Sequence, residues 1–229
     1  AFATSAGLKT VFISKEPSDV IGLKKSIRIQ QFQFQFKSLL KFKPLPFIMP
    51  NAFDVVFISS VRSAEFLIED ARLDLTKCTL ACVGSQTAFR LEKIGLIPDF
   101  IGSNAGNPLS VSKAFSKWLG SRKVFIPHSN LSLRSIESEI SKEQIYSVEI
   151  YETLLQEVEI GPKDVYVFTS PSNVDAFFRI NHLSHASFLI AWGHSTKYAL
   201  QTYAKEPDFV LEHGRLDELE AILNTLIKS

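Results

Sequence analysis

The sequence predicts an α/β protein built from two similar parallel-sheet domains, one of them inserted in the other. Three observations lead to this fold class. Short β-branched and aromatic runs are followed by hydroxyl-rich turns and then by helical patterns. Several of these units recur at a nearly constant spacing along the chain. One unit comes first in one copy of the repeat and last in the other. The chain has 229 residues, enough for two domains of about 100 residues each.

The clearest repeat contains a glycine turn. Residues 83–87 (Val-Gly-Ser-Gln-Thr) resemble residues 192–196 (Trp-Gly-His-Ser-Thr), and each segment follows a short apolar run and leads into an amphipathic helix. Further on, residues 98–101 (Pro-Asp-Phe-Ile) match residues 207–210 (Pro-Asp-Phe-Val). Both matches have the same offset, since 193 − 84 and 208 − 99 are each 109. A shared register over two landmarks indicates an internal duplication.

Two further pairs of strands extend the repeat. Residues 55–59 resemble residues 166–170, and Val11–Ile13 resembles Val124–Ile126. The last unit comes first in one copy and last in the other. We therefore expect a first domain over residues 1–28 and 157–229, interrupted by a second domain over residues 46–144.

Two segments, 29–45 and 145–156, must then connect the domains. Residues 31–36 alternate glutamine and phenylalanine with the period of a half-buried strand, and residues 147–153 carry β-branched and aromatic side chains. We expect these two runs to pair as an antiparallel two-stranded ladder. The alternative is that residues 31–36 form an edge strand of one domain.

Composition restricts the classes of partner. There are 25 basic and 24 acidic residues, for a net charge of +1, which argues against a dedicated nucleic-acid binder. No apolar run approaches the length of about 20 residues that spans a bilayer. Cys78 and Cys82 are too close in sequence for a useful disulfide, so we expect buried thiols and a cytoplasmic protein.

No residue pattern predicts a metal ion or another cofactor. His182 and His185 lie in a polar segment without the further ligands that a zinc site requires. The glycine spacing fits neither a phosphate-binding loop nor a dinucleotide fingerprint. We therefore expect a site without a cofactor.

Taken together, the ordered motifs resemble the uroporphyrinogen-III synthase family. They comprise residues 168–174 (Phe-Thr-Ser-Pro-Ser-Asn-Val), the paired Gly-x-x-Thr turns at 84–87 and 193–196, and Tyr-Glu-Thr at 151–153, within the interrupted domain order. The resemblance covers residues 11 to about 226. It implies a hydro-lyase of haem biosynthesis that closes hydroxymethylbilane into uroporphyrinogen III, with loss of water and inversion of the last pyrrole ring, as a monomer without a cofactor.

The predicted site follows from the polar turns that precede helices. Helix N-termini bind carboxylates through free N–H groups and a partial positive charge, and such turns lie at the carboxyl ends of parallel strands. The candidate substrate-binding residues are Ser59, Ser60, Ser85, Gln86, Thr87, Ser170, Ser172, Asn173, His194, Ser195, Thr196 and Lys15.

Each candidate also has a structural interpretation. Ser59, Ser170, Thr87 and Thr196 could be helix N-caps, and Gly84 and Gly193 could serve tight backbone geometry. Lys15 and Arg134 stand near positions where the family often carries arginine, but they could equally be solvated surface charges.

Tyr151 is the candidate catalytic residue, because a phenol can donate a proton to the departing hydroxyl group. A tyrosine in an alternating strand is otherwise usually a packing residue. If none of these groups is catalytic, the same two domains would form a non-catalytic binder of a small polyanion.

Overall fold

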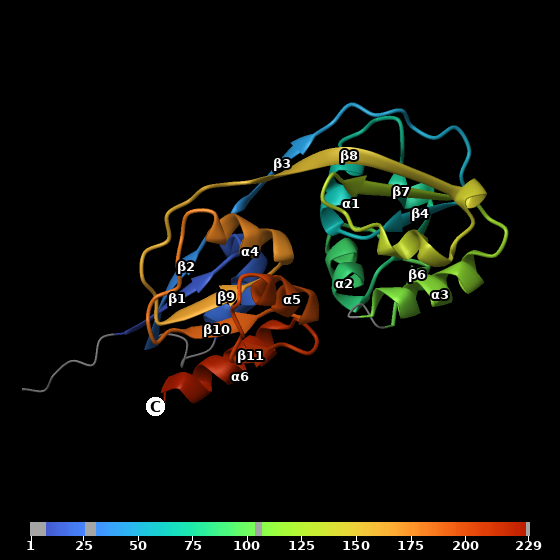
Figure 1. Ribbon diagram of the computed structural model, residues 1–229. Coiled ribbons are helices and arrows are strands. Elements are labelled where there is room, and N and C mark those ends of the chain that lie inside the picture. Colours follow the sequence, from blue (N-terminus) through green and yellow to red (C-terminus); the bar gives the residue numbers. More distant parts are fainter. Residues whose placement is uncertain (1–7, 26–30, 104–106, 228–229) are drawn as a thin grey trace, which may run out of the picture. The chain divides into compact units, whose positions relative to one another are not determined.

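The computed structural model describes residues 8–25, 31–103 and 107–227, and it divides into two compact units. Unit 1 comprises Ala1–Lys41 with Leu155–Ser229, and unit 2 comprises Phe42–Leu154. Unit 2 thus interrupts unit 1 in the chain, and the predicted fold class is confirmed (Figure 1). Residues 1–7 and 26–30, which fall in the predicted first domain and connecting segment, lie outside the described residues.

Unit 1 contains a five-stranded parallel sheet in the order β11-β10-β9-β1-β2. Its strands are β1 (Lys9–Ile13), β2 (Phe32–Phe36), β9 (Val165–Phe168), β10 (Phe188–Ala191) and β11 (Phe209–Val210). Its helices are the 3-10 segment η1 (Pro17–Lys25), α4 (Pro171–Phe178), α5 (His194–Thr202) and α6 (Leu216–Ile227).

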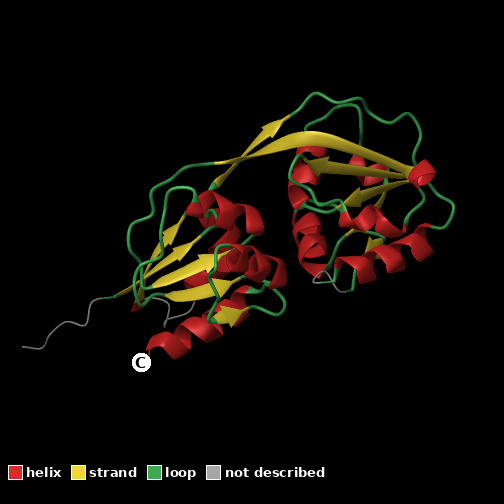
Figure 2. Cartoon of the chain, in the orientation of Figure 1, coloured by secondary structure: helices red, strands yellow, loops and turns green. Residues whose placement is uncertain are grey.

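Helices cover both faces of this sheet (Figure 2). Leu219 and Leu223 of α6 pack with Val11 and Val167 on one face. On the other face, helices α4 and α5 pack against a second cluster of strand side chains. The central strands are therefore buried on both faces and read as continuous apolar runs.

Unit 2 contains a six-stranded sheet in the order β3-β8-β7-β4-β5-β6, apart from the first two residues of β3 and the last residue of β8, which belong to unit 1. Its strands are β3 (Leu40–Pro44), β4 (Val55–Ile58), β5 (Thr79–Cys82), β6 (Phe100–Ile101), β7 (Val124–Ser129) and β8 (Ile145–Leu155). Its helices are α1 (Val61–Ile68), α2 (Ser85–Lys93) and α3 (Pro108–Leu119), with 3-10 segments η3 (Leu75–Lys77), η4 (Ser135–Glu139) and η5 (Lys142–Gln144). Helices α1 and α2 pack on one face, and α3 on the other.

The expected ladder between residues 31–36 and 147–153 is wrong in its first strand. Strand β2 instead pairs in parallel with β1, as the edge strand of the unit 1 sheet. It does so because Phe32 is buried in the cluster that β1 and α6 also form. The neighbour of β8 is β3, and the two run antiparallel, since the Leu45 N–H donates to the Ile150 carbonyl and the Gln156 N–H donates to the Leu39 carbonyl.

The sequence repeat has a matching repeat of hydrogen bonds. A carboxylate oxygen of Asp99 accepts from the Leu80 N–H at 2.8 Å, and one of Asp208 accepts from the Leu189 N–H at 2.7 Å. Each aspartate also donates its own N–H to the carbonyl of the same leucine. The Pro-Asp-Phe motif therefore fastens β6 to β5 and β11 to β10 in the same way.

Candidate active site

Four hydroxyl-bearing or glycine turns connect a strand to the helix that follows it. In unit 2 they follow the neighbouring parallel strands β4 and β5, and in unit 1 they follow the neighbouring parallel strands β9 and β10. Neighbouring parallel strands end at the same edge of a sheet. Each unit therefore places two helix N-termini side by side at the carboxyl edge of its own sheet.

Serine caps one helix in each pair. The Ser60 hydroxyl accepts from the Arg62 N–H at the start of α1, and the Ser170 hydroxyl accepts from the Asn173 N–H at the start of α4. The interpretation of Ser170 as a cap is confirmed, whereas that of Ser59 is wrong, because Ser60 has the extended backbone and the capping bond. Ser59 lies between β4 and this cap.

The Asn173 side chain forms hydrogen bonds with other residues of unit 1. Its Oδ1 accepts from the buried Leu39 N–H at 2.9 Å, and its Nδ2 donates to the Ser170 hydroxyl at 2.9 Å. The neighbouring Ser172 belongs to the first turn of α4 and is partly exposed. Of these two candidates, Ser172 is the more accessible side chain.

The other helix in each pair begins at a glycine. Gly84 is the N-cap of α2 and Gly193 the N-cap of α5, and neither helix start has a side-chain capping bond. The expectation that Thr87 and Thr196 are caps is wrong, because both lie inside the first turn. Thr196 is also buried.

The backbone conformation does not require glycine at these two positions. Their φ angles are −178° at Gly84 and −179° at Gly193, an extended conformation that any residue adopts. A Cβ atom at Gly193 would meet nothing within 4 Å. At Gly193 the prediction of tight geometry is therefore wrong, and a bare N-cap there leaves the first amides of α5 open to an approaching group.

The remaining candidates in the glycine turns are open to solvent. Ser85 and Gln86 open α2, His194 and Ser195 open α5, and all four side chains are exposed.

Lys15 lies at the carboxyl edge of unit 1, just beyond β1. Its Nζ lies 5.1 Å from the centre of the Trp192 ring. Trp192 directly precedes the Gly193 turn. The turn after β1 is joined to the turn after β9, because the Thr169 N–H donates to the Ser14 hydroxyl at 2.9 Å and the Thr169 hydroxyl donates to the Ser14 carbonyl at 2.8 Å. These contacts place a cation beside the uncapped helix start.

Trp192 is a residue that the sequence patterns did not single out. Gly214, with φ of +63°, lies against its ring, and a Cβ there would come within 3.1 Å of the indole Cδ1 and Nε1 atoms. Gly214 and Lys15 thus both lie close to the Trp192 ring. The signal in the sequence was an aromatic residue immediately before the glycine of the turn.

Tyr151 has a different environment from the one expected. Its side chain is 5% exposed within the core of unit 2, where its ring centre lies 5.1 Å from Phe66 and 6.1 Å from Phe42. These contacts agree with the alternative that the Tyr151 ring is a packing residue of the strand. The ring acts as a packing element of the core.

Arg134 forms an ion pair within unit 2. Its guanidinium contacts the Glu137 carboxylate at 2.8 and 2.7 Å, and the Ser147 hydroxyl donates to the same carboxylate at 2.6 Å. Burial opposes ionisation of Glu137, but the hydrogen bonds from Arg134 and Ser147 hold its pKa below the ordinary value. The Arg134 charge is thus balanced locally.

Other features of the described residues concern metals, thiols and membranes. No group of three or more potential metal ligands occurs among them. Cys82 is buried and Cys78 partly buried, and burial raises the pKa of the Cys82 thiol to about 11. Within the same residues, no helix is long and apolar enough to cross a membrane.

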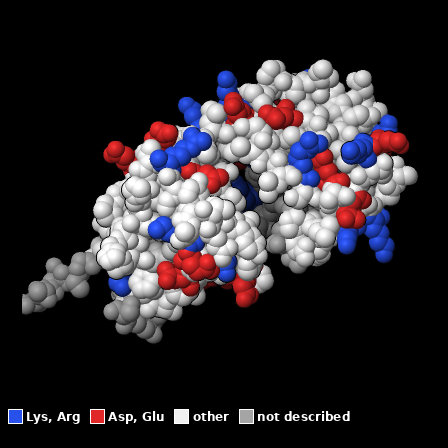
Figure 3. All heavy atoms as spheres, viewed as in Figure 1, with Lys and Arg blue, Asp and Glu red and all other residues white. Residues whose placement is uncertain are grey.

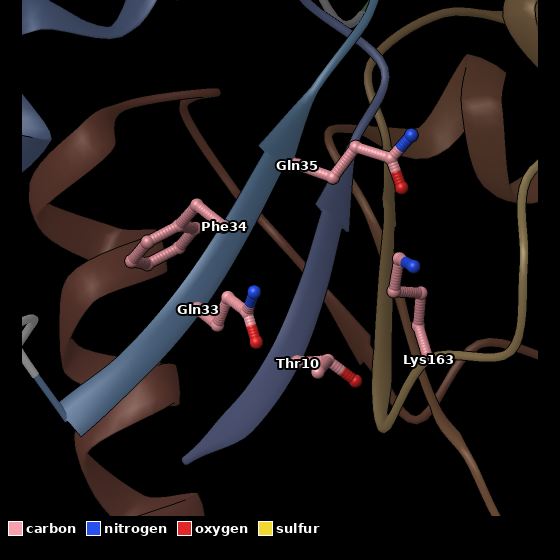
Figure 4. A pocket seen from close by; sticks show the side chains of 5 residues that line it. All are labelled: Thr10, Gln33, Phe34, Gln35 and Lys163. Carbon is pink, nitrogen blue, oxygen red and sulfur yellow. The ribbon is translucent and has the colours of Figure 1, made fainter.

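Surface charge is of mixed sign on one face of the described residues (Figure 3), and two cavities are lined by residues other than the predicted site residues. Basic and acidic side chains are interspersed over both units on the face shown in Figure 3. Two cavities, of about 300 Å³ (Figure 4) and about 410 Å³, contain none of the predicted site residues.

Comparison with known proteins gives a family and two similar folds. The profile of the family described as uroporphyrinogen-III synthase HemD matches residues 22–221. The uroporphyrinogen-III synthetase structure from Helicobacter pylori 26695 aligns with a TM-score of 0.70 at 15% identity, covering 95% of this chain and 99% of that one. A mutant uroporphyrinogen III synthase from the extremely thermophilic bacterium Thermus thermophilus aligns with a TM-score of 0.58 at 16% identity, covering 96% and 100%.

A search of curated protein sequences gives no match. At these identities the two solved structures support the fold, whereas the family profile covers most of the chain. The chain therefore belongs to the uroporphyrinogen-III synthase family, whose members are enzymes that act on a small molecule.

Proposed function

We propose that this chain is a hydro-lyase that converts hydroxymethylbilane into uroporphyrinogen III. In this reaction the terminal hydroxyl group leaves as water, the open chain of four pyrroles closes, and the last pyrrole is inverted. The observation that carries the proposal is the pair of glycine-started helices, α2 and α5, whose first amides have no side-chain cap. Free amides of this kind bind carboxylates without a formal positive charge.

The substrate carries acetate and propionate groups on every ring, so it needs many anion-binding groups. In the proposed complex, the amides around Ser85, Gln86 and Thr87 hold carboxylates on unit 2. The turn of His194, Ser195 and Thr196 does the same on unit 1. The serine-capped starts of α1 and α4, with Ser59, Ser60, Ser170, Ser172 and Asn173, contribute amides and hydroxyl groups beside them.

Lys15 supplies the formal charge in unit 1. Its position over the Trp192 ring keeps the ammonium group next to the Gly193 turn, and a cation–π contact of this type stabilises such an arrangement by about 0.5–1 kcal/mol at an exposed site. A carboxylate bound at the α5 amides would lie close to this charge.

Catalysis in this proposal depends mainly on holding the bilane in a folded conformation. Positioning can lower a barrier by up to about 7–11 kcal/mol in well-oriented systems, and the pyrrole nitrogens themselves assist departure of the hydroxyl group. Tyr151 is proposed as the proton donor in the substrate-bound state. Its ring packs against Phe42 and Phe66, and the proposal requires its hydroxyl group to reach the bound substrate.

The proposed catalytic unit is a single chain in the cytoplasm that needs no cofactor, nucleic acid or membrane. All proposed contacts come from one chain, and both cysteines are free thiols, in keeping with a reducing compartment.

The burial of Tyr151 and the Arg134–Glu137 ion pair favour a second candidate, a two-unit binder of a polyanion without catalytic activity. Freshly prepared hydroxymethylbilane separates the two candidates. An active enzyme gives the III isomer after oxidation of the product, whereas a binder leaves only the I isomer that forms spontaneously. Formation of the I isomer alone by the folded protein would refute the proposed function.

A further inference from the structure

The two most exposed aromatic side chains among the described residues occupy equivalent positions of the repeat. Phe89 is 56% exposed and Tyr198 is 62% exposed. Their positions differ by 109, since 198 − 89 = 109, which is the offset of the two glycine turns. Each lies in the second turn of a helix that begins at an uncapped glycine, α2 or α5. Single exposed apolar residues are common on protein surfaces, but an aromatic residue at both equivalent positions indicates a shared role.

Core packing does not account for these two rings. Leu91 and Leu200, which are also 109 apart, are fully buried and hold α2 and α5 against the cores of their units. Residues two apart on a helix point in directions about 200° apart, so Phe89 and Tyr198 face away from these cores. Aromatic residues are also weaker helix formers than alanine or leucine. Helix stability therefore does not explain them either.

The exposed rings lie near the uncapped amides. Phe89 follows Ser85, the first residue of α2, by four positions, and Tyr198 follows His194, the first residue of α5, by four positions. Residues four apart share a helix face, and helical side chains lean toward the N-terminus. The four residues advance about 6 Å along the helix axis. Each aromatic side chain is thus directed toward the turn that carries the free amides.

Unit 2 adds a cation on the same helix face. The Lys93 Nζ lies 5.0 Å from the centre of the Phe89 ring, and Lys93 belongs to the last turn of α2. The Phe89 ring therefore has amides toward one end of the helix and an ammonium group toward the other. This arrangement suits a flat apolar ring that carries two negatively charged groups. The equivalent residue of α5 is the uncharged Thr202, since 202 − 93 = 109, so the additional cation is specific to unit 2.

A pyrrole of hydroxymethylbilane has this chemistry. Each pyrrole is a flat aromatic ring with one acetate and one propionate group. The propionate carboxyl carbon lies three C–C bonds from the ring, a reach of about 4 Å, and a hydrogen bond to an amide adds about 2.9 Å. Together these lengths span the distance of about 6 Å along the helix. A pyrrole can therefore pack against the aromatic side chain while its carboxylate binds the first amides.

We propose that Phe89 and Tyr198 are positioning residues for the substrate. Each ring packs against one pyrrole of the bilane, and a carboxylate of that pyrrole binds the first amides of the same helix. At α2, Lys93 pairs with the second carboxylate of the pyrrole. This inference rests on the proposed function and adds to it that the bilane is held by its rings as well as by its carboxylates, which restricts the orientation of each ring before closure.

Substitution by leucine tests the ring contacts. Phe89→Leu and Tyr198→Leu keep an apolar side chain and a strong helix former but remove the aromatic face. Each should lower kcat/KM by about twofold to tenfold, mainly through KM, because the contact already exists in the bound substrate. Phe89→Tyr and Tyr198→Phe exchange the residues of the two units, keep the ring, and should retain the wild-type constants. Leu109→Ala, at a 48% exposed residue of α3, is the matched control for loss of exposed apolar surface and should also retain them.

Binding of a fragment provides a second measurement. The probe is a monopyrrole with one acetate and one propionate group, added to the full chain and followed by amide NMR. The Ser85 and His194 amide resonances should shift in the wild-type protein. Phe89→Leu should weaken the response at Ser85 and leave that at His194, and Tyr198→Leu should do the reverse. Urea titrations check that the variants remain folded.

The outcomes separate this inference from the proposed function. Formation of only the I isomer by the wild-type protein refutes the function. If the wild-type protein forms the III isomer and both leucine variants keep its KM and kcat, the inference alone is overturned. An equal loss in the ring-exchange variants or in Leu109→Ala, or a probe that shifts neither the Ser85 nor the His194 amide, overturns it as well.

Discussion

Replacement of Gly193 by aspartate should make the protein more stable and less active. Gly193 already has the extended backbone of an N-cap residue, and a Cβ atom there meets nothing within 4 Å. An aspartate can therefore enter without strain and accept hydrogen bonds from the first amides of α5. In doing so it occupies the groups that we propose for a substrate carboxylate.

The two effects differ in size. Aspartate exceeds glycine as an N-cap by a few tenths of a kcal/mol, and its charge adds about 0.3–1 kcal/mol at a helix N-terminus. Loss of hydrogen bonds to a charged substrate group costs about 1.5–3 kcal/mol, which corresponds to a fall in kcat/KM of roughly tenfold to more than a hundredfold.

Three variants separate charge from capping. Gly193→Asn caps the helix without a charge, and Gly193→Ala adds only a methyl group. We expect a rise in the free energy of unfolding for Asp and Asn in urea titrations, and the lowest kcat/KM for Asp. If Gly193→Asp keeps wild-type kcat/KM while stabilising the fold, the α5 amides do not bind the substrate and the reasoning fails.

Three further predictions concern single residues. Tyr151→Phe should lower kcat by about tenfold if the phenol donates a proton, and unchanged turnover in the isomer assay would leave it a packing residue only. Gly95 has φ of +84° and Ala204 occupies the equivalent position with φ of +54°, so Gly95→Ala should destabilise and Ala204→Gly stabilise the protein by about 1 kcal/mol in urea titrations; opposite signs would contradict the duplication of this turn. At pH 8 an alkylating reagent should modify Cys78 before Cys82, because burial raises the pKa of Cys82 to about 11 and leaves little thiolate; mass spectrometry after unfolding should show both modified, and early loss of Cys82 would refute its burial.

The sequence predicted the repeated units well because each carries its own local signals. A buried parallel strand, a polar turn and a helix can be recognised within about 20 residues, and the Pro-Asp-Phe repeat marks bonds that recur in both units, at Asp99 and Asp208. These features depend on contacts between neighbouring elements, so the local amino-acid pattern predicts them.

The partner of a strand and the accessibility of a side chain are not local properties. The alternation in residues 31–36 indicates a half-buried strand, but it does not say which strand lies beside it. The same is true of Tyr151, whose burial depends on Phe42 and Phe66, distant in sequence. The predicted cap at Ser59 lies one residue before the observed cap at Ser60, because capping depends on backbone angles rather than on the presence of a hydroxyl group.

The duplicated units share a division of roles between their two helix starts. In each unit one helix is capped by a serine, Ser60 or Ser170, and its neighbour begins at a glycine, Gly84 or Gly193. At Gly193 the backbone is extended and a Cβ atom would meet nothing within 4 Å. A residue that caps the helix better than glycine would therefore fit at this position. The absence of a cap at both equivalent positions is explained if the amides bind carboxylates from outside the chain. A protein with a net charge of +1 could then hold a polyanion through its backbone, and a capping side chain at either glycine would weaken that binding even where it stabilises the helix.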